Sequence, residues 1–107
     1  MTDALMVYMT CGSGGEAERI VEALLERKLV ACANILAPHT ALYRWNGKVE
    51  KDQETGVIVK TGVALFEQVE EVICQMHSYE CPCIVAWPVS QGHEPYMLWL
   101  AQETGAV

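Results

Sequence analysis

The segment from His77 to Cys83, with the sequence HSYECPC, places one imidazole and two thiols within a few residues of one another. Imidazole and thiolate bind soft metal ions, and two thiolates with one imidazole would favour Cu(I) or Zn. Cys81 and Cys83 flank a proline, and in an extended chain their side chains would face one way. The spacing is not that of the paired Cys-x-x-Cys sets typical of structural zinc. The segment predicts a weak soft-metal contact at His77; the alternative is a helix-capping histidine with two packing cysteines.

Further cysteines stand at positions 11, 32 and 74. Cys11 ends the first expected strand and Cys32 begins the second, and we expect those two ends to lie close together and near His77. The sequence therefore predicts a metal-binding group of His77, Cys11, Cys32 and Cys83. For the cysteines the alternative is a buried thiol in tight packing. Cys74 falls on the polar side of an expected helix and is assigned no role.

A row of carboxylates follows the Asn46-Gly47 pair. Glu50, Asp52 and Glu54 recur at every second residue, so in a strand they project from one face. Hard divalent cations bind such oxygens. A solvated strand face or an ion-pair network between subunits is the alternative.

The elements that must position these residues follow from the hydrophobic pattern. An unbroken apolar run predicts a strand at 4–11, and an apolar stripe predicts a helix at 16–29 with Ser13 as a cap. Asn46-Gly47 is typical of a type I′ turn and predicts a long hairpin. The remaining expected elements are the hairpin strands 31–45 and 48–61, a helix at 63–77, an edge strand at 83–91 and a short helix at 94–104.

This order of elements predicts an α+β fold. It matches the ferredoxin-like β-α-β-β-α-β unit, a four-stranded antiparallel sheet with two helices on one face, followed by a short C-terminal helix. We expect residues 1–107 to form a single domain. Two helices cover only one face, whereas strand 4–11 is apolar on both. We therefore expect a symmetric protein partner to cover the other face of the sheet.

Composition narrows the classes of partner. The chain of 107 residues has a formal net charge of −7, which disfavours binding to nucleic acid or to an anionic membrane. It has no apolar run of the roughly 18 residues that a membrane helix needs and no basic leader, so we expect a cytoplasmic protein with reduced thiols. It also lacks a Walker lysine and a nucleophile elbow, and we expect no catalysis.

Several short motifs, taken in order along the chain, resemble the CutA1 divalent-cation tolerance family. The matching pieces are ACANI (31–35), YRWNGKVEKDQE (43–54), KT (60–61), His77 with Tyr79, Pro82 and Ile84, and Tyr96 with Trp99 and Leu100. The resemblance implies a ferredoxin-like fold assembled as a homotrimer through long hairpins that pair between subunits. It also implies association with copper and other divalent ions, with no tightly bound cofactor.

The resemblance further implies a cleft between subunits. Lys60 and Tyr79 match positions that line this cleft in the family, and Tyr43, Trp45 and Glu54 are expected beside them. A small anion held by Lys60 would make the protein a signalling or interaction module similar to the trimeric PII regulators. Plain interface packing is the alternative.

Two positions depart from the family pattern. Cys83 stands where many relatives have an acidic residue after the proline, and Met9 stands where a strand-end cysteine is expected, with Cys11 two residues further on. At position 83 a soft sulfur ligand thus replaces an acidic one, and at the end of the first strand the cysteine is shifted by two residues.

Overall fold

The computed structural model describes residues 2–106 and has the predicted order of elements. These elements are β1 (Ala4–Cys11), α1 (Gly14–Glu26), β2 (Cys32–Trp45), β3 (Lys48–Gly62), the 3₁₀ turn η1 (Val63–Leu65), α2 (Phe66–Met76), β4 (Ile84–Pro88) and α3 (Glu94–Glu103). No helix in this part of the chain is long and apolar enough to cross a membrane.

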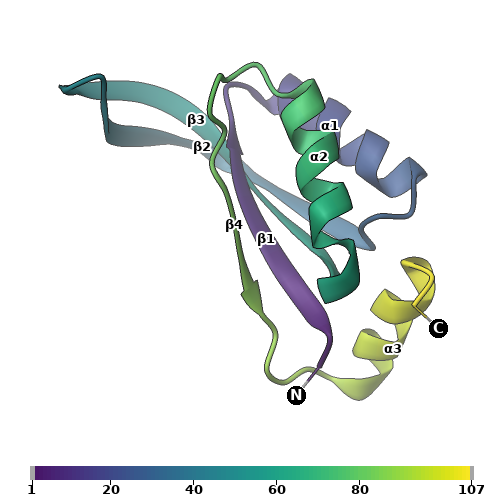
Figure 1. The fold of residues 1–107 in the computed structure, drawn as a ribbon. Helices are drawn as coiled ribbons and strands as arrows, with labels where there is room; N and C mark the ends of the chain where they lie inside the picture. Colours follow the sequence, from purple (N-terminus) through teal and green to yellow (C-terminus); the bar gives the residue numbers. More distant parts are fainter. Residues whose placement is uncertain (1, 107) are drawn as a thin grey trace.

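The strands form one antiparallel sheet in the order β2-β3-β1-β4. Helices α1 and α2 lie side by side against one face, and α3 lies near the end of the sheet where the chain begins (Figure 1). The ferredoxin-like α+β prediction is confirmed. The far half of the β2–β3 hairpin projects beyond the helices, and the molecule measures 45 × 26 × 23 Å.

The hairpin turn forms where Asn46-Gly47 predicted it. Asn46 has a φ of 50° and Gly47 a φ of 78°, the positive values that this tight turn requires. A bulge between Ile35 and Pro38 shifts the register of β2 against β3, as expected for a proline that lacks an amide hydrogen. The strands stay paired as far as Trp45 and Lys48.

Helix boundaries differ from the prediction by a few residues. The first helix begins at Gly14 because Ser13 caps it, with the Ser13 hydroxyl accepting a 3.1 Å hydrogen bond from the Glu16 amide. It ends at Glu26, since Lys28 adopts a positive φ of 59°. Met76 is 40% exposed because it is the last residue of α2 and the backbone turns extended at His77.

The core lies between the two helices and the inner face of the sheet. Fully buried side chains of β1 and β3 pack there against both helices: Val7, Met9, Val57, Val59, Ile20, Leu24, Val69 and Ile73. The outer face of the sheet stays accessible at the paired strands β1 and β4. There Val85, which pairs with Tyr8, is 52% exposed, and Trp87, which pairs with Met6, is 42% exposed. One subunit therefore leaves an apolar sheet face uncovered.

Candidate functional site

Two neighbouring features lie at the end of the sheet where β1 finishes and α2 finishes. One is a buried cluster of Cys11, Glu16 and His77. The other is a wide hollow on the uncovered face, bounded by the hairpin and by residues 79–83. Tyr79 links them, because its ring lies 4.7 Å from the ring of His77 and its hydroxyl reaches into the hollow.

The buried cluster contains three groups that can bind metals. One donor atom each from Cys11, Glu16 and His77 lies within 4.8 Å of the others. Cys11 is the last residue of β1, Glu16 is in the first turn of α1, and His77 caps the end of α2. The helix that follows β1 therefore begins beside the point where the second helix ends.

Both ring nitrogens of His77 are already hydrogen-bonded. The Tyr79 amide donates to Nδ1 over 3.0 Å, and Nε2 lies 2.7 Å from the Thr10 carbonyl oxygen. Because Nδ1 accepts, Nε2 carries the proton and donates to Thr10. His77 thus fastens β1 to the segment after α2, and neither nitrogen has a lone pair free for a metal.

Glu16, in α1, also connects the end of β1 with the segment after α2. Its carboxylate accepts hydrogen bonds from the Gly12 amide at 2.9 Å and from the Ser78 amide at 2.8 Å. Burial acts to raise the Glu16 pKa, but the hydrogen bonds from Ser78 and Gly12 and the electrostatic effect of His77 outweigh it, and the pKa is lowered. The carboxylate is therefore held ionised although its residue is only 5% exposed.

Cys11 is buried as a neutral thiol. Burial first, and then the charges of Glu16 and Glu54, raise the Cys11 pKa to about 11. Metals bind the thiolate, which this environment disfavours near neutral pH. As it stands, the cluster is a hydrogen-bonded clamp, and a metal ion would enter only by displacing the bonds of His77 and the proton of Cys11.

Thiol labelling tests this description of Cys11. We expect Cys74, which is exposed on α2, to react rapidly with a maleimide at pH 7.5, and Cys11 to react only when the protein unfolds. Peptide mass mapping after brief labelling distinguishes the two sites. Equal modification of Cys11 and Cys74 in the native protein would contradict the burial of Cys11.

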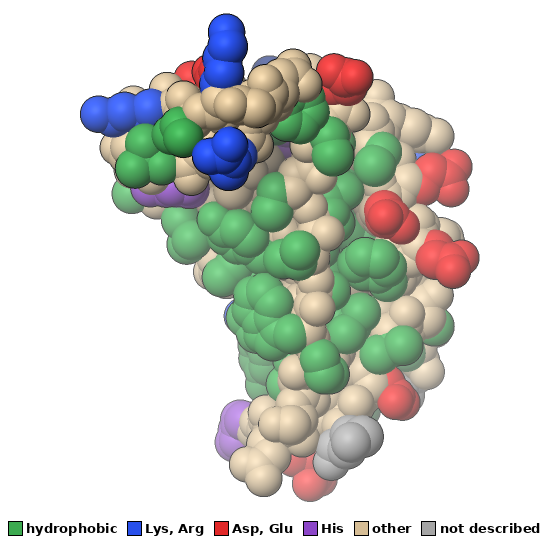
Figure 2. All heavy atoms as spheres, turned by 60° about the vertical axis from the view of Figure 1, so that its left-hand side comes forward, with side chains coloured by type: hydrophobic (Ala, Val, Ile, Leu, Met, Phe, Trp, Pro, Cys, Tyr) green, Lys and Arg blue, Asp and Glu red, His purple; other side chains and the backbone are tan. Residues whose placement is uncertain are grey.

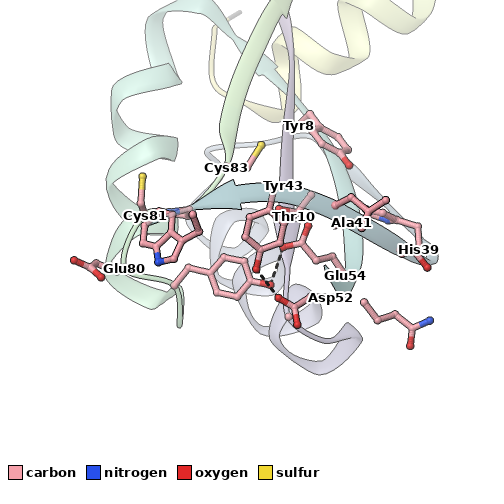
Figure 3. Close-up of a pocket in the computed structure, with 17 residues that line it drawn as sticks. Tyr8, Thr10, His39, Ala41, Tyr43, Asp52, Glu54, Glu80, Cys81 and Cys83 are labelled. Atoms are coloured by element: carbon pink, nitrogen blue, oxygen red, sulfur yellow. Dashed lines mark hydrogen bonds between the residues drawn. The ribbon is translucent and has the colours of Figure 1, made fainter. Parts of the chain in front are cut away.

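The hollow has a volume of about 1050 Å³ and is open to solvent. Tyr43, Asp52 and Glu54 converge on it from the hairpin (Figure 3). Tyr79 lines it from the loop after α2. Tyr79 donates a 2.8 Å hydrogen bond to Glu54, and Tyr43 donates to Asp52. The Asp52 hydrogen bond is the main cause that raises the Tyr43 pKa to about 12, so the phenol keeps its proton.

The charge in this hollow is negative. Its lining, among the described residues, includes the carboxylates of Asp52, Glu54 and Glu80 and the thiols of Cys81 and Cys83, with no lysine or arginine. Partial burial and the charge of Glu54 raise the pKa of Cys83. The arrangement suits a cation better than an anion.

The structure brings together most of the expected cleft but not its lysine. Tyr43, Trp45, Tyr79 and Glu54 all line the hollow. Lys60 lies six residues beyond Glu54 on β3, about 20 Å away, where its ammonium donates to the Tyr96 hydroxyl over 3.1 Å. Within one subunit the placement of Lys60 beside the other cleft residues is therefore wrong, whereas a cleft between subunits that includes Lys60 stays a prediction. The interpretation as a module similar to the PII regulators has no support.

The expected grouping of Cys11 with Cys32 is also wrong. Cys11 pairs with Thr55 and Cys32 with Lys60, which places them about 16 Å apart along β3. The reason is topological, since α1 returns the chain to the opposite end of the sheet before β2 begins. Cys32 instead contacts the Tyr96 hydroxyl at 3.3 Å, while Cys83 lines the hollow.

Sequence reasoning missed Glu16, which holds the clamp together. Ser13 and Glu16 form the Ser-x-x-Glu pattern of a helix capping box, which would have drawn attention to this glutamate. In this chain the carboxylate reaches one residue further back than in the usual box, to the Gly12 amide, and also binds Ser78. The second contact depends on tertiary structure.

Comparison with known proteins gives one consistent result. Residues 5–103 match the family model described as CutA1 divalent ion tolerance protein. The divalent-cation tolerance protein CutA of Pyrococcus horikoshii is 42% identical over 100 residues, which cover 94% of this chain and 97% of that one. The corresponding protein of Archaeoglobus fulgidus is 43% identical over 94 residues, covering 88% and 91% of the two chains.

Solved structures agree with the sequence comparison. The divalent cation tolerance protein of Thermus thermophilus superimposes with a TM-score of 0.93 at 39% identity, covering 95% of this chain and 99% of that one. The Archaeoglobus fulgidus structure, described as a periplasmic divalent cation tolerance protein, has a TM-score of 0.92 at 40% identity, covering 94% and 98%.

Proposed function

This chain belongs to the CutA1 divalent ion tolerance family, and from that membership we propose that it serves in divalent-cation tolerance by binding soft cations, copper among them, weakly and reversibly. It binds them as cargo, keeps no resident cofactor and catalyses no reaction. We place it in the cytoplasm, where its free cysteines stay reduced.

One observation carries this proposal: the solvent-open hollow is lined by carboxylates and thiols without a balancing lysine or arginine among the described residues. Such a lining lowers the electrostatic free energy of an entering cation. The carboxylates of Asp52 and Glu54 supply the charge, and Cys83 supplies a soft ligand. Because no closed coordination shell is preformed among these residues, the binding is weak.

Two exposed cysteines, Cys81 and Cys83, line the hollow. The first contact with a soft ion is Cys83, because of the two it is the one close enough to Glu54 to feel the charge of that carboxylate. His77 and Cys11 become ligands only when the clamp opens, since His77 has both nitrogens bonded and Cys11 holds its proton. Cys32 is remote from them and would bind an ion separately.

We further propose that the protein is a homotrimer, the assembly that the family resemblance implies. The uncovered sheet face supports it: Val85 and Trp87 are exposed in a single subunit beside the half-buried Met6 and Tyr8. An apolar face of this kind favours association with further copies of the chain.

Metal titration tests the binding proposal. Cu(I), Cu(II) and Zn(II) are titrated into the wild type, Cys83→Ser and Cys74→Ser, with a competing chelator to fix the free ion concentration. We expect Cys83→Ser to weaken Cu(I) binding about tenfold, because the soft ligand is lost. Cys74→Ser removes an exposed thiol outside the hollow and should leave the affinity unchanged. Absence of binding by the wild type, or equal affinities for all three proteins, would refute the proposal.

A further inference from the structure

A second groove lies at the end of the sheet opposite to the hollow. It is formed where β1 begins, where β3 ends and continues into η1, and along α3 (Figure 1). Its volume of about 720 Å³ is within the range of roughly 300–1000 Å³ typical of small-molecule sites. Ala4 lines this groove and Thr10 lines the hollow, so six residues of β1, about 20 Å, separate the two. We call the second groove the α3 groove.

Most of the lining of the α3 groove is apolar. Leu100 and Ala4 are buried there, whereas Val63 on η1 and Leu98 on α3 are 54% and 50% exposed. Water therefore contacts large aliphatic side chains on two of the elements that form the groove. Met97 completes the lining with a flexible thioether, which adapts to ligands of different shape. An aliphatic chain that displaces this water gains free energy in proportion to the apolar area it covers.

The charged side chains of the α3 groove are acidic. Asp3 and Glu94 line it and are exposed, and the described part of its lining includes no lysine, arginine or histidine. The hydroxyls of Thr2 and Thr104 are already occupied, since each donates a hydrogen bond to a backbone carbonyl. Lys and Arg side chains gather at the projecting end of the hairpin, whereas acidic side chains lie at the opposite end of the molecule (Figure 2). The groove thus combines an apolar surface with two carboxylates.

We propose that the α3 groove binds an aliphatic amine in its protonated form. The chain of the amine lies along Val63, Met97 and Leu98, and the ammonium group lies beside the carboxylates of Asp3 and Glu94, which accept its hydrogen bonds. Burial of the chain supplies most of the affinity, because exposed ion pairs contribute little, whereas the carboxylates select the sign of the head group. A fatty acid would bring a third carboxylate to the same place and is disfavoured.

This inference is independent of the proposed metal binding and of the proposed trimer. Every residue of the α3 groove belongs to one subunit, and none of them lines the hollow. An amine could nevertheless coordinate a metal ion bound elsewhere on the protein. The experiments below are therefore made with excess EDTA.

Calorimetric titration with matched ligands tests the inference. Octylammonium, octanol and octanoate share one chain and differ in charge at pH 7, whereas butylammonium keeps the head group and loses half of the chain. We expect octylammonium to bind at least about tenfold more tightly than octanoate, with octanol between them. Butylammonium should bind at least about tenfold more weakly than octylammonium, because each fully buried CH₂ changes the affinity by about fourfold.

Two variants assign the binding to the α3 groove. Asp3→Asn/Glu94→Gln removes both charges and should weaken octylammonium binding at least about threefold, with octanol binding unchanged. Ala101→Phe fills the groove and should weaken the binding of octylammonium and octanol alike by at least about tenfold. The matched control, Glu18→Gln/Glu22→Gln, removes two charges from exposed positions of α1 outside the groove and should bind octylammonium like the wild type. Circular dichroism checks that each variant is folded.

Leu98→Asn replaces Ala101→Phe if the larger side chain prevents folding, because Leu98 is half exposed and its loss leaves the core intact. Absence of octylammonium binding by the wild type would refute the inference. Octanoate that bound as tightly as octylammonium would refute the charge preference, and butylammonium that did so would refute the apolar contact. An octylammonium affinity that either groove variant left unchanged would place the ligand outside the α3 groove and refute the site.

Discussion

Replacement of Glu16 by glutamine is expected to lower the free energy of unfolding by about 3 kcal/mol. The carboxylate accepts from the Gly12 and Ser78 amides, and a hydrogen bond to a charged group contributes about 1.5–3 kcal/mol. Glutamine keeps one acceptor oxygen but turns an NH₂ group toward the other amide, which then loses its partner in a partly buried position. Urea unfolding at fixed protein concentration measures the change, because assembly adds a concentration-dependent contribution.

Glu18→Gln is the matched control for this prediction. Glu18 lies on the same helix but is exposed, so its loss of charge should alter stability by no more than about 0.5 kcal/mol. If the two variants were equally stable, the Glu16 clamp would not be a source of stability.

The pH dependence of stability, compared between the wild type and Glu16→Gln, shows whether the ionised Glu16 carboxylate stabilises the fold. Because the Glu16 pKa is lowered in the folded protein, the unfolded state binds this proton more readily, and the stability it contributes is present above the ordinary carboxyl pKa of about 4.3. That contribution is lost as the pH falls through the folded pKa. The difference in stability between wild type and Glu16→Gln should therefore shrink as the pH falls below about 5. A difference that stayed constant down to the acid unfolding transition would contradict the lowered pKa.

Local patterns in the sequence predicted the elements because each depends on residues close together in the chain. The unbroken apolar run of β1, the stripe of α1 and the Asn46-Gly47 turn all encode their structure within a few positions. The order of these elements then leaves few topologies for a short chain. The ferredoxin-like fold followed from this, and the exact helix ends did not, since they depend on single backbone angles such as the positive φ of Lys28.

The site was harder to predict because it joins residues that are distant along the chain. Strand β2 begins at the end of the sheet opposite to the end of β1, which separates Cys32 from Cys11. Whether His77 could bind a metal depended on its two backbone partners, Thr10 and Tyr79, and no spacing rule contains that information. Residue type indicates which ligands are possible, whereas hydrogen bonding decides which lone pairs remain free.

The second large effect is expected from Val85→Asp on the uncovered sheet face. Val85 lies opposite Tyr8 and is 52% exposed, so a carboxylate there remains solvated in a single subunit and the fold should persist. In a homotrimer that covers this face, the same carboxylate would lose water without gaining a partner, at a cost of several kcal/mol in each subunit. We expect the apparent affinity of assembly to fall more than about 100-fold.

The control and the readout must separate dissociation from unfolding. Gln68→Asp introduces the same charge on the exposed side of α2, away from the sheet, and should assemble like the wild type. Native mass and circular dichroism are measured together: Val85→Asp should give the mass of one subunit with the wild-type helix content. Because Val85 is not part of the hairpin, this variant tests coverage of the sheet face independently of any contact through the hairpin. If Val85→Asp kept the wild-type assembly, the apolar sheet face would not be the surface that joins the subunits.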